Sequence, residues 1–124
     1  MEKLDVLVAD DSEELRDIVG HCLRSLGHTV TSVETGRQAI SLLKTRYFDL
    51  VVTDVIMPDA DGIEVISEAK KRYPSTRIVV MTGGGEVIDP AYCVKLAKTM
   101  GAHVAILKPF KPDQFIEAVG LALN

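Results

Sequence analysis

The chain lacks tryptophan, has only 5% aromatic residues and contains two cysteines among its 124 residues. Cys22 and Cys93 have neither metal-ligand nor redox-pair spacing, which predicts two reduced thiols in a cytoplasmic protein. The longest apolar run, residues 118–123, is far shorter than the roughly 20 residues of a membrane-spanning helix. The first residues also lack the pattern of a signal peptide. We therefore expect neither a disulfide-stapled secreted domain nor contact with a membrane.

A large excess of charge of one sign is absent as well. The net charge of −4 is too small for a disordered chain, and its acidic sign argues against direct binding of nucleic acid. What is present is apolar sequence, at 47% hydrophobic residues. A chain of this length and composition fits one domain, residues 1–124, that buries a core without a disulfide or metal staple.

Five short β-rich apolar runs alternate with amphipathic stretches along the whole chain. The runs at 4–9, 50–53 and 78–81 contain continuous rather than alternating apolar residues, which indicates strands covered on both faces of a parallel sheet. The run at 29–33 is more polar and suits an edge strand. The fifth run lies at 104–107.

Apolar residues in the intervening stretches recur at intervals of three and four, which predicts five helices. Their apolar faces span residues 15–26, 39–43, 65–69, 93–100 and 115–123. The expected fold is therefore α/β: a doubly wound, five-stranded parallel (βα)₅ sheet with helices on both faces. In such a fold the functional site lies at the carboxyl ends of the strands.

Four of the five strands lead into polar side chains at that edge. Three carboxylates crowded there suit magnesium, a hard cation that prefers oxygen ligands. A hydroxyl and an ammonium opposite the metal suit the oxygens of a transferring phosphoryl group, and a carboxylate can act as the nucleophile. Each residue alone could be a helix cap, a turn residue or a surface lysine, but together they indicate a Mg²⁺-dependent phosphoryl site. These residues are Asp10, Asp11, Asp54, Thr82 and Lys108.

The motifs at these strand ends resemble the response-regulator receiver domain, the CheY-like family of two-component phosphorelay systems. The resemblance covers essentially the whole chain and implies a flavodoxin-like three-layer sandwich. It also implies a phosphorylation-activated signalling switch rather than an enzyme, and no output domain within this chain. The motifs are Asp10-Asp11, residues 54–62 (DVIMPDADG), Thr82-Gly83 and Lys108-Pro109-Phe110.

The resemblance implies a role for each site residue. Asp54 would accept a phosphoryl group from the phosphohistidine of a sensor histidine kinase or phosphotransfer protein, and Thr82 and Lys108 would contact the phosphoryl oxygens. The Lys108–Pro109 bond would be cis, and Gly62 would permit a tight turn after the phosphorylation site. The implied Mg²⁺ ligands are Asp11, Asp54, the backbone carbonyl of Ile56 and, through water, Asp10.

The resemblance also implies an output surface, built from residues 93–100, 104–107 and 115–123. Phosphorylation would change the affinity of this surface for an unknown downstream protein, and the surface is a candidate homodimer interface. Two features depart from the family pattern. Ala105 stands where the family usually has an aromatic switch residue, and the glycine-rich stretch 83–92 is longer than usual.

Two other interpretations are disfavoured by the sequence. A haloacid-dehalogenase-like phosphohydrolase also uses an Asp nucleophile and Mg²⁺, but it places a second Asp two residues later, where this chain has Ile56, and it usually needs a cap domain. The histidines could mark a metal site, but they lack the spacing for one, so helix-surface or strand-end positions are expected. They are His21, His28 and His103.

Overall fold

The structure, a computed structural model of the whole chain, describes residues 3–124 except 56, 58, 60, 84–94 and 96. Five parallel strands form one sheet in the order β2-β1-β3-β4-β5, so β2 is an edge strand, as predicted. The order reverses at β1, which confirms the doubly wound arrangement. The strands are β1 (Asp5–Ala9), β2 (Thr29–Val33), β3 (Leu50–Asp54), β4 (Arg77–Gly83) and β5 (Val104–Lys108).

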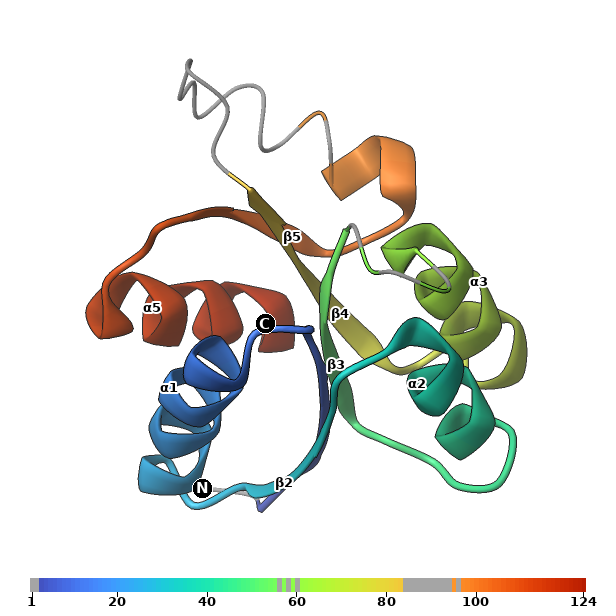
Figure 1. Cartoon of the computed structure of the whole chain (residues 1–124), viewed down its shortest axis with the longest axis horizontal. Coiled ribbons are helices and arrows are strands. Elements are labelled where there is room, and N and C mark those ends of the chain that lie inside the picture. Colours follow the sequence, from blue (N-terminus) through green and yellow to red (C-terminus); the bar gives the residue numbers. More distant parts are fainter. Residues whose placement is uncertain (1–2, 56, 58, 60, 84–94, 96) are drawn as a thin grey trace.

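Helices cover both faces of the sheet (Figure 1). One face carries α1 and α5 and the other carries α2 and α3, which contact each other. Residues 95 and 97–100 are also helical, and the rest of the helix predicted at 93–100 lies outside the described residues. None of the helices in the described part of the chain has the length and apolarity needed to cross a bilayer. The helices are α1 (Glu13–Ser25), α2 (Gly36–Leu43), α3 (Gly62–Arg72) and α5 (Pro112–Leu123).

The sheet separates two hydrophobic layers. Because successive side chains of a strand point to opposite faces, Val6 and Val8 of β1 pack with α1 and α5, whereas Leu7 packs on the other face with α2 and α3. All three side chains are fully buried. A strand covered on both faces needs apolar residues at every position, which explains the continuous runs in the sequence.

Three strands extend farther at their carboxyl ends than the apolar runs predicted. Asp54 pairs with Met81, and Lys108 pairs with Gly83, so both polar residues lie within the ladder rather than after it. The backbone hydrogen bonds of a parallel sheet do not depend on the polarity of the side chains, so a strand can include polar residues at its end. The apolar run in the sequence therefore ends before the strand does. The consequence is that the polar side chains at this edge are held by strand backbone.

Two of the histidines lie at the opposite edge of the sheet, as the strand-end prediction expected. His28 precedes β2 and its Nδ1 accepts a hydrogen bond from the Leu4 N–H at 3.2 Å. His103 precedes β5 and its Nδ1 accepts from the Ile78 N–H at 3.0 Å. Each imidazole therefore accepts a hydrogen bond from the backbone of a neighbouring chain segment. An Nδ1 atom can accept this bond only when it carries no proton.

The contact at His103 predicts a loss of stability in mild acid. Burial, followed by the positive charges of Arg77 and Lys70, holds the pKa of His103 below its usual value of 6.5. The neutral His103 ring therefore makes its full contribution to the free energy of unfolding above pH 6.5. This contribution is lost as the pH falls through the lower pKa of the folded state. We expect an NMR titration of the folded protein to give a His103 midpoint below that measured in urea. A higher midpoint in the folded protein would contradict this interpretation.

Candidate functional site

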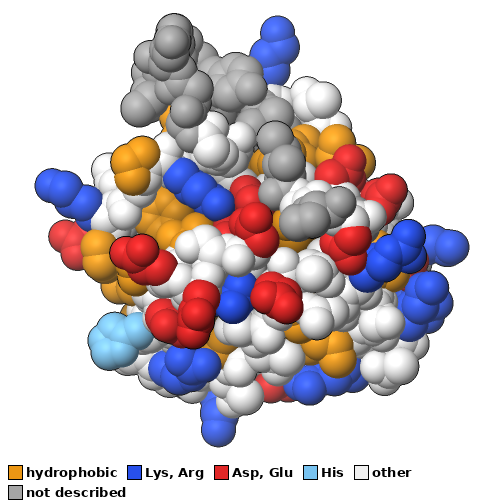
Figure 2. Space-filling view, viewed as in Figure 1, with side chains coloured by type: hydrophobic (Ala, Val, Ile, Leu, Met, Phe, Trp, Pro, Cys, Tyr) orange, Lys and Arg blue, Asp and Glu red, His pale blue; other side chains and the backbone are white. Residues whose placement is uncertain are grey.

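The predicted site residues meet at the carboxyl edge of the sheet. Asp10 and Asp11 follow β1 and Asp54 ends β3, and one carboxylate oxygen of each lies within 4.8 Å of the others. Figure 2 shows acidic side chains gathered across the middle of the visible face. Strands that are far apart in sequence thus deliver three carboxylates to one place, as the fold prediction required.

The first turn of α1 explains why Asp10 and Asp11 are available. Ser12 is the N-cap, and its Oγ accepts the Leu15 N–H at 3.2 Å. The alternative that Asp10 or Asp11 serves as the cap is therefore wrong. Asp10 instead turns into the sheet edge and is fully buried, while Asp11 is exposed.

Lys108 joins two of the carboxylates. From the end of β5, its Nζ lies 2.7 Å from Asp10 Oδ2 and 3.2 Å from Asp54 Oδ1. Burial alone would lower the pKa of Lys108, but the hydrogen bond and charge of Asp10, followed by those of Asp54, outweigh burial and raise it. The ammonium therefore stays charged at neutral pH and acts as a fixed cation within the acidic cluster.

Burial disfavours the ionised form of Asp54. Its pKa is raised above the usual 3.8, chiefly by burial, with the Lys108 charge opposing and the Asp10 charge adding to the rise. Its Oδ1 also accepts the Val55 N–H at 2.9 Å. The ammonium of Lys108 therefore offsets only part of the effect of burial on Asp54. The ionised form of Asp54 is thus disfavoured and would gain from a further cation.

The donor set fits a hard divalent cation. Three carboxylates have oxygens within 4.8 Å of one another, and the ammonium of Lys108 pairs with two of them. Magnesium prefers oxygen ligands of this kind. Ile56, whose backbone carbonyl is the remaining predicted ligand, lies outside the described residues. The carboxylate part of the predicted ligand set therefore has the chemistry and proximity for Mg²⁺.

Thr82 lies at the same edge, on the strand between Asp54 and Lys108. It pairs with Leu107 in β5, one position before the Gly83–Lys108 pair, and is half-buried. The stretch predicted as a long loop continues from Gly83 into residues 84–92, which lie outside the described residues, as does Cys93.

Two supporting residues were not found from the sequence. Arg16 donates from Nη1 to the backbone carbonyl of Asp10, six positions earlier, at 2.7 Å. Asp59, in the segment after β3, accepts hydrogen bonds from the start of α2. For Arg16, the available sequence signal is its spacing from the acidic pair, DD-x₄-R. Asp59 has no such signal, because its hydrogen-bond partners are more than 20 positions away in the sequence.

Gly62 has a different reason to be glycine than the predicted tight turn. Among the glycines described, positive φ angles occur at Gly27 and Gly101, not at Gly62. A Cβ at Gly62 would lie 2.3 Å from the backbone oxygen of Asp54, far inside van der Waals contact. The start of α3 therefore packs directly against the backbone of the candidate acceptor residue.

Comparison with known proteins decides the family. The model of the response regulator receiver domain matches residues 6–120. The chain belongs to the response regulator receiver domains. This receiver domain is 34% identical over 124 residues to NtrC, a DNA-binding transcriptional regulator of Azospirillum brasilense, covering 100% of the chain and 25% of that protein.

Solved structures agree with the assignment. The chemotaxis response regulator CheY4 of Vibrio cholerae superimposes with a TM-score of 0.82 at 27% identity, covering 96% of this receiver domain and 98% of CheY4. NtrX of Brucella abortus gives 0.84 at 30% identity, covering 98% of this domain and 27% of NtrX. The receiver domain thus spans about a quarter of NtrC and NtrX. The predicted CheY-like fold and family are confirmed, and the phosphohydrolase alternative is not supported.

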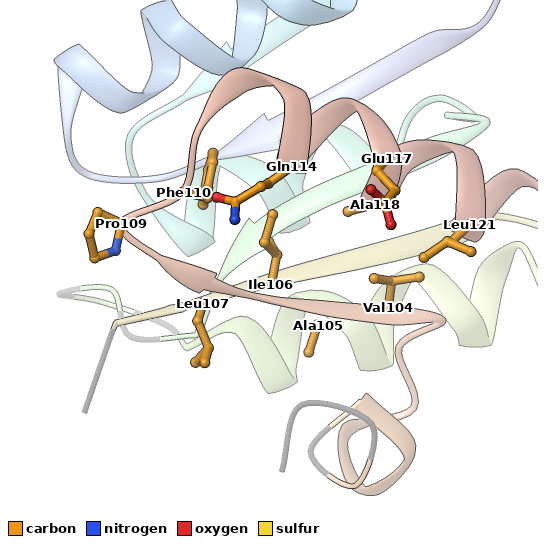
Figure 3. A pocket seen from close by; sticks show the side chains of 10 residues that line it. All are labelled: Val104, Ala105, Ile106, Leu107, Pro109, Phe110, Gln114, Glu117, Ala118 and Leu121. Carbon is orange, nitrogen blue, oxygen red and sulfur yellow. The ribbon is translucent and has the colours of Figure 1, made fainter. Parts of the chain in front are cut away.

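Ala105 lies in the middle of β5 of this receiver domain. It pairs with Val80 and packs in the layer of α2 and α3, and Figure 3 shows its side chain pointing away from α5, whereas Ile106 points toward α5. The Lys108–Pro109 bond is cis, as the family resemblance implied.

Proposed function

We propose that this receiver domain is a phosphorylation-activated signalling switch in which Asp54 is the phosphoacceptor. The donor would be the phosphohistidine of a sensor histidine kinase or of a phosphotransfer protein. The observation that carries the proposal is the position of Asp54 within the carboxylate cluster, 3.2 Å from the ammonium of Lys108. Membership of the receiver family supports it.

The transfer needs only one bond formed and one broken. A carboxylate oxygen of Asp54 attacks phosphorus and forms a P–O bond, while the P–N bond to the donor imidazole breaks and its electron pair stays on the ring nitrogen. Lys108, fixed by Asp10 at 2.7 Å, is placed to donate to the oxygens of the arriving phosphoryl group. We assign the Thr82 hydroxyl a second contact to those oxygens.

Mg²⁺ is the proposed cofactor. Asp11 and Asp54 would hold it directly, Asp10 through water, and the backbone carbonyl of Ile56 would complete the protein ligands. When bound, the ion neutralises carboxylate charge and the charge that develops on the phosphoryl oxygens. The raised pKa of Asp54, caused first by burial, supports the need for this additional cation.

The proposed output surface is formed by β5, α5 and the helical residues 97–100. A groove there runs between β5 and α5, with Ile106, Phe110 and Gln114 toward one end and Leu121 at the other (Figure 3). Leu121, which lines the groove, is 61% exposed. We propose a downstream protein as the partner, and we keep this face as the candidate homodimer interface.

We propose that residues 1–124 form one receiver domain and that this domain does not turn over a substrate as an enzyme does. NtrC is described as a DNA-binding transcriptional regulator, so control of transcription is a proposed destination of the signal, with the nucleic acid bound outside this domain. The cytoplasmic location stays a prediction from the sequence.

Phosphorylation from a small donor tests the function. After incubation with acetyl phosphate and Mg²⁺, we expect the intact mass to increase by one phosphoryl group, and we expect no increase when EDTA removes the metal. An unchanged mass in a folded sample would contradict the proposal. Repeated release of phosphate from a phosphate monoester would instead favour the phosphohydrolase.

A further inference from the structure

Asp59 lies between β3 and α3, and its carboxylate contacts a different helix. Its Oδ1 accepts the Gly36 N–H at 3.1 Å and its Oδ2 accepts the Arg37 N–H at 3.3 Å. These donors are the first two residues of α2. One carboxylate thus connects the segment leading out of Asp54 to a helix more than 20 residues earlier in the sequence.

The start of α2 also has a cap of its own. Thr35 is the N-cap, and its side chain accepts the Gln38 N–H while Gln38 accepts the Thr35 N–H. The first turn of α2 contains no acidic residue. Asp59 therefore satisfies two donors that the capping box leaves free, and it supplies the negative charge that a helix N-terminus favours.

The segment that carries Asp59 is fixed at its base. Val55 donates its N–H to Met81 in β4 at 3.0 Å, and Gly62 donates to the Val55 carbonyl at 2.7 Å. Met57 is buried in the layer of α2 and α3. Among the described residues of the segment, Asp59 is the one whose side chain hydrogen-bonds to α2.

We propose that Asp59 is a positioning residue for the phosphorylation site. By joining its own position, five residues after Asp54, to the start of α2, its carboxylate helps to hold the end of β3 beside the carboxylate cluster. Binding of Mg²⁺ at the carboxylate cluster and the position of the α2 N-terminus are then linked, and linkage between two sites is reciprocal. The inference rests on the proposed function, because it takes Mg²⁺ as the ion that the cluster binds.

A matched pair of variants separates positioning from helix capping. Asp59→Ala removes both the cap and the connection, whereas Thr35→Ala removes a cap from the same helix and leaves the connection. We expect both to lower the melting temperature. Only Asp59→Ala should weaken Mg²⁺ binding, by about threefold to tenfold in isothermal titration calorimetry. This loss is no larger than the usual loss of metal affinity when a residue that supports the metal ligands is mutated. Asp59→Asn, which keeps one acceptor oxygen, should lie between.

NMR gives a readout that capping alone would not change. In the wild type and in Thr35→Ala, Mg²⁺ should shift the amide resonances of Gly36 and Arg37, and these shifts should disappear in Asp59→Ala. Equal Mg²⁺ affinity in the two alanine variants, or unchanged shifts in Asp59→Ala, would overturn the proposal. If the wild type gives neither heat nor shifts with Mg²⁺, the proposed metal site fails as well. Heat in all variants with equal affinities would refute the role of Asp59 alone.

Discussion

An Asp54→Asn variant should take no phosphoryl group from acetyl phosphate and should unfold at a higher temperature than the wild type. The amide has nearly the shape of the carboxylate but lacks its nucleophilic oxygen, so no aspartyl phosphate forms. The gain in stability follows from electrostatics. Burial raises the pKa of Asp54, the charge of Lys108 opposes this rise, and the charge of Asp10 adds to it. The net pKa is raised, so the ionised form of Asp54 is disfavoured in the folded protein.

The sign of this effect gives it a pH dependence. A carboxyl whose folded-state pKa lies above its unfolded value contributes stability below pH 3.8, and this contribution is lost as the pH rises through the folded-state pKa. The free energy of unfolding of Asp54→Asn, relative to wild type, should therefore increase from acid toward neutral pH. Urea denaturation at a series of pH values measures it.

Asp17→Asn is the matched control for this variant. Asp17 is exposed on α1, so its replacement removes one carboxylate charge away from the cluster. This control should accept one phosphoryl group as the wild type does. Phosphorylation of Asp54→Asn at the wild-type rate would place the acceptor elsewhere, and a lower melting temperature would contradict the electrostatic argument.

Gly62→Ala should destabilise the fold by about 3 kcal/mol, the upper end of the usual cost of overpacking. The new Cβ would lie 2.3 Å from the Asp54 backbone oxygen and 3.0 Å from the Cα of Val55. Both are backbone atoms at the end of β3, so relief requires moving the strand end or α3. The same movement would displace Asp54, and we expect slower phosphorylation as well as a lower free energy of unfolding in urea.

Gly120→Ala supplies the opposite result from the same substitution. Apart from the backbone of its own helix and its chain neighbours, no described atom lies within 4 Å of the Cβ that it would add on α5. Because alanine is the better helix former, we expect a gain of about 0.5–1 kcal/mol and unchanged phosphorylation. Equal effects of the two substitutions would show that the close approach at Gly62 does not determine its identity.

The sheet and its layers could be predicted because burial on two faces leaves a direct record in hydropathy. Leu7 and Val8 are adjacent in sequence, yet each lies in a different layer, and only a strand covered on both sides requires both to be apolar. The position of Asp54 followed from the same rule, since the carboxyl ends of parallel strands share one edge.

Contacts across long sequence separations could not be predicted in this way. The sequence does not indicate which of Asp10, Asp11 and Ser12 caps α1, since all three side chains can accept the same N–H. The role of Asp59 could not be predicted, because its two donors on α2 become neighbours only when α2 and α3 pack side by side. Likewise, Gly62 suggested a turn, whereas the close packing of α3 on Asp54 is the reason for it.

The pair formed by Lys108 and Asp10 implies a competition during signalling. Lys108 reaches from β5 past the ends of β4 and β3 to Asp10, which is fully buried. The other carboxylate oxygen of Asp10 accepts the Ser12 N–H. A phosphoryl group on Asp54 would attract the same ammonium. Movement of Lys108 toward the phosphoryl group would weaken its pair with the buried carboxylate of Asp10, which costs free energy. In the proposed switch, the strength of the Asp10–Lys108 pair would therefore contribute to the equilibrium between the resting and phosphorylated forms. A weaker pair would set a lower threshold for activation.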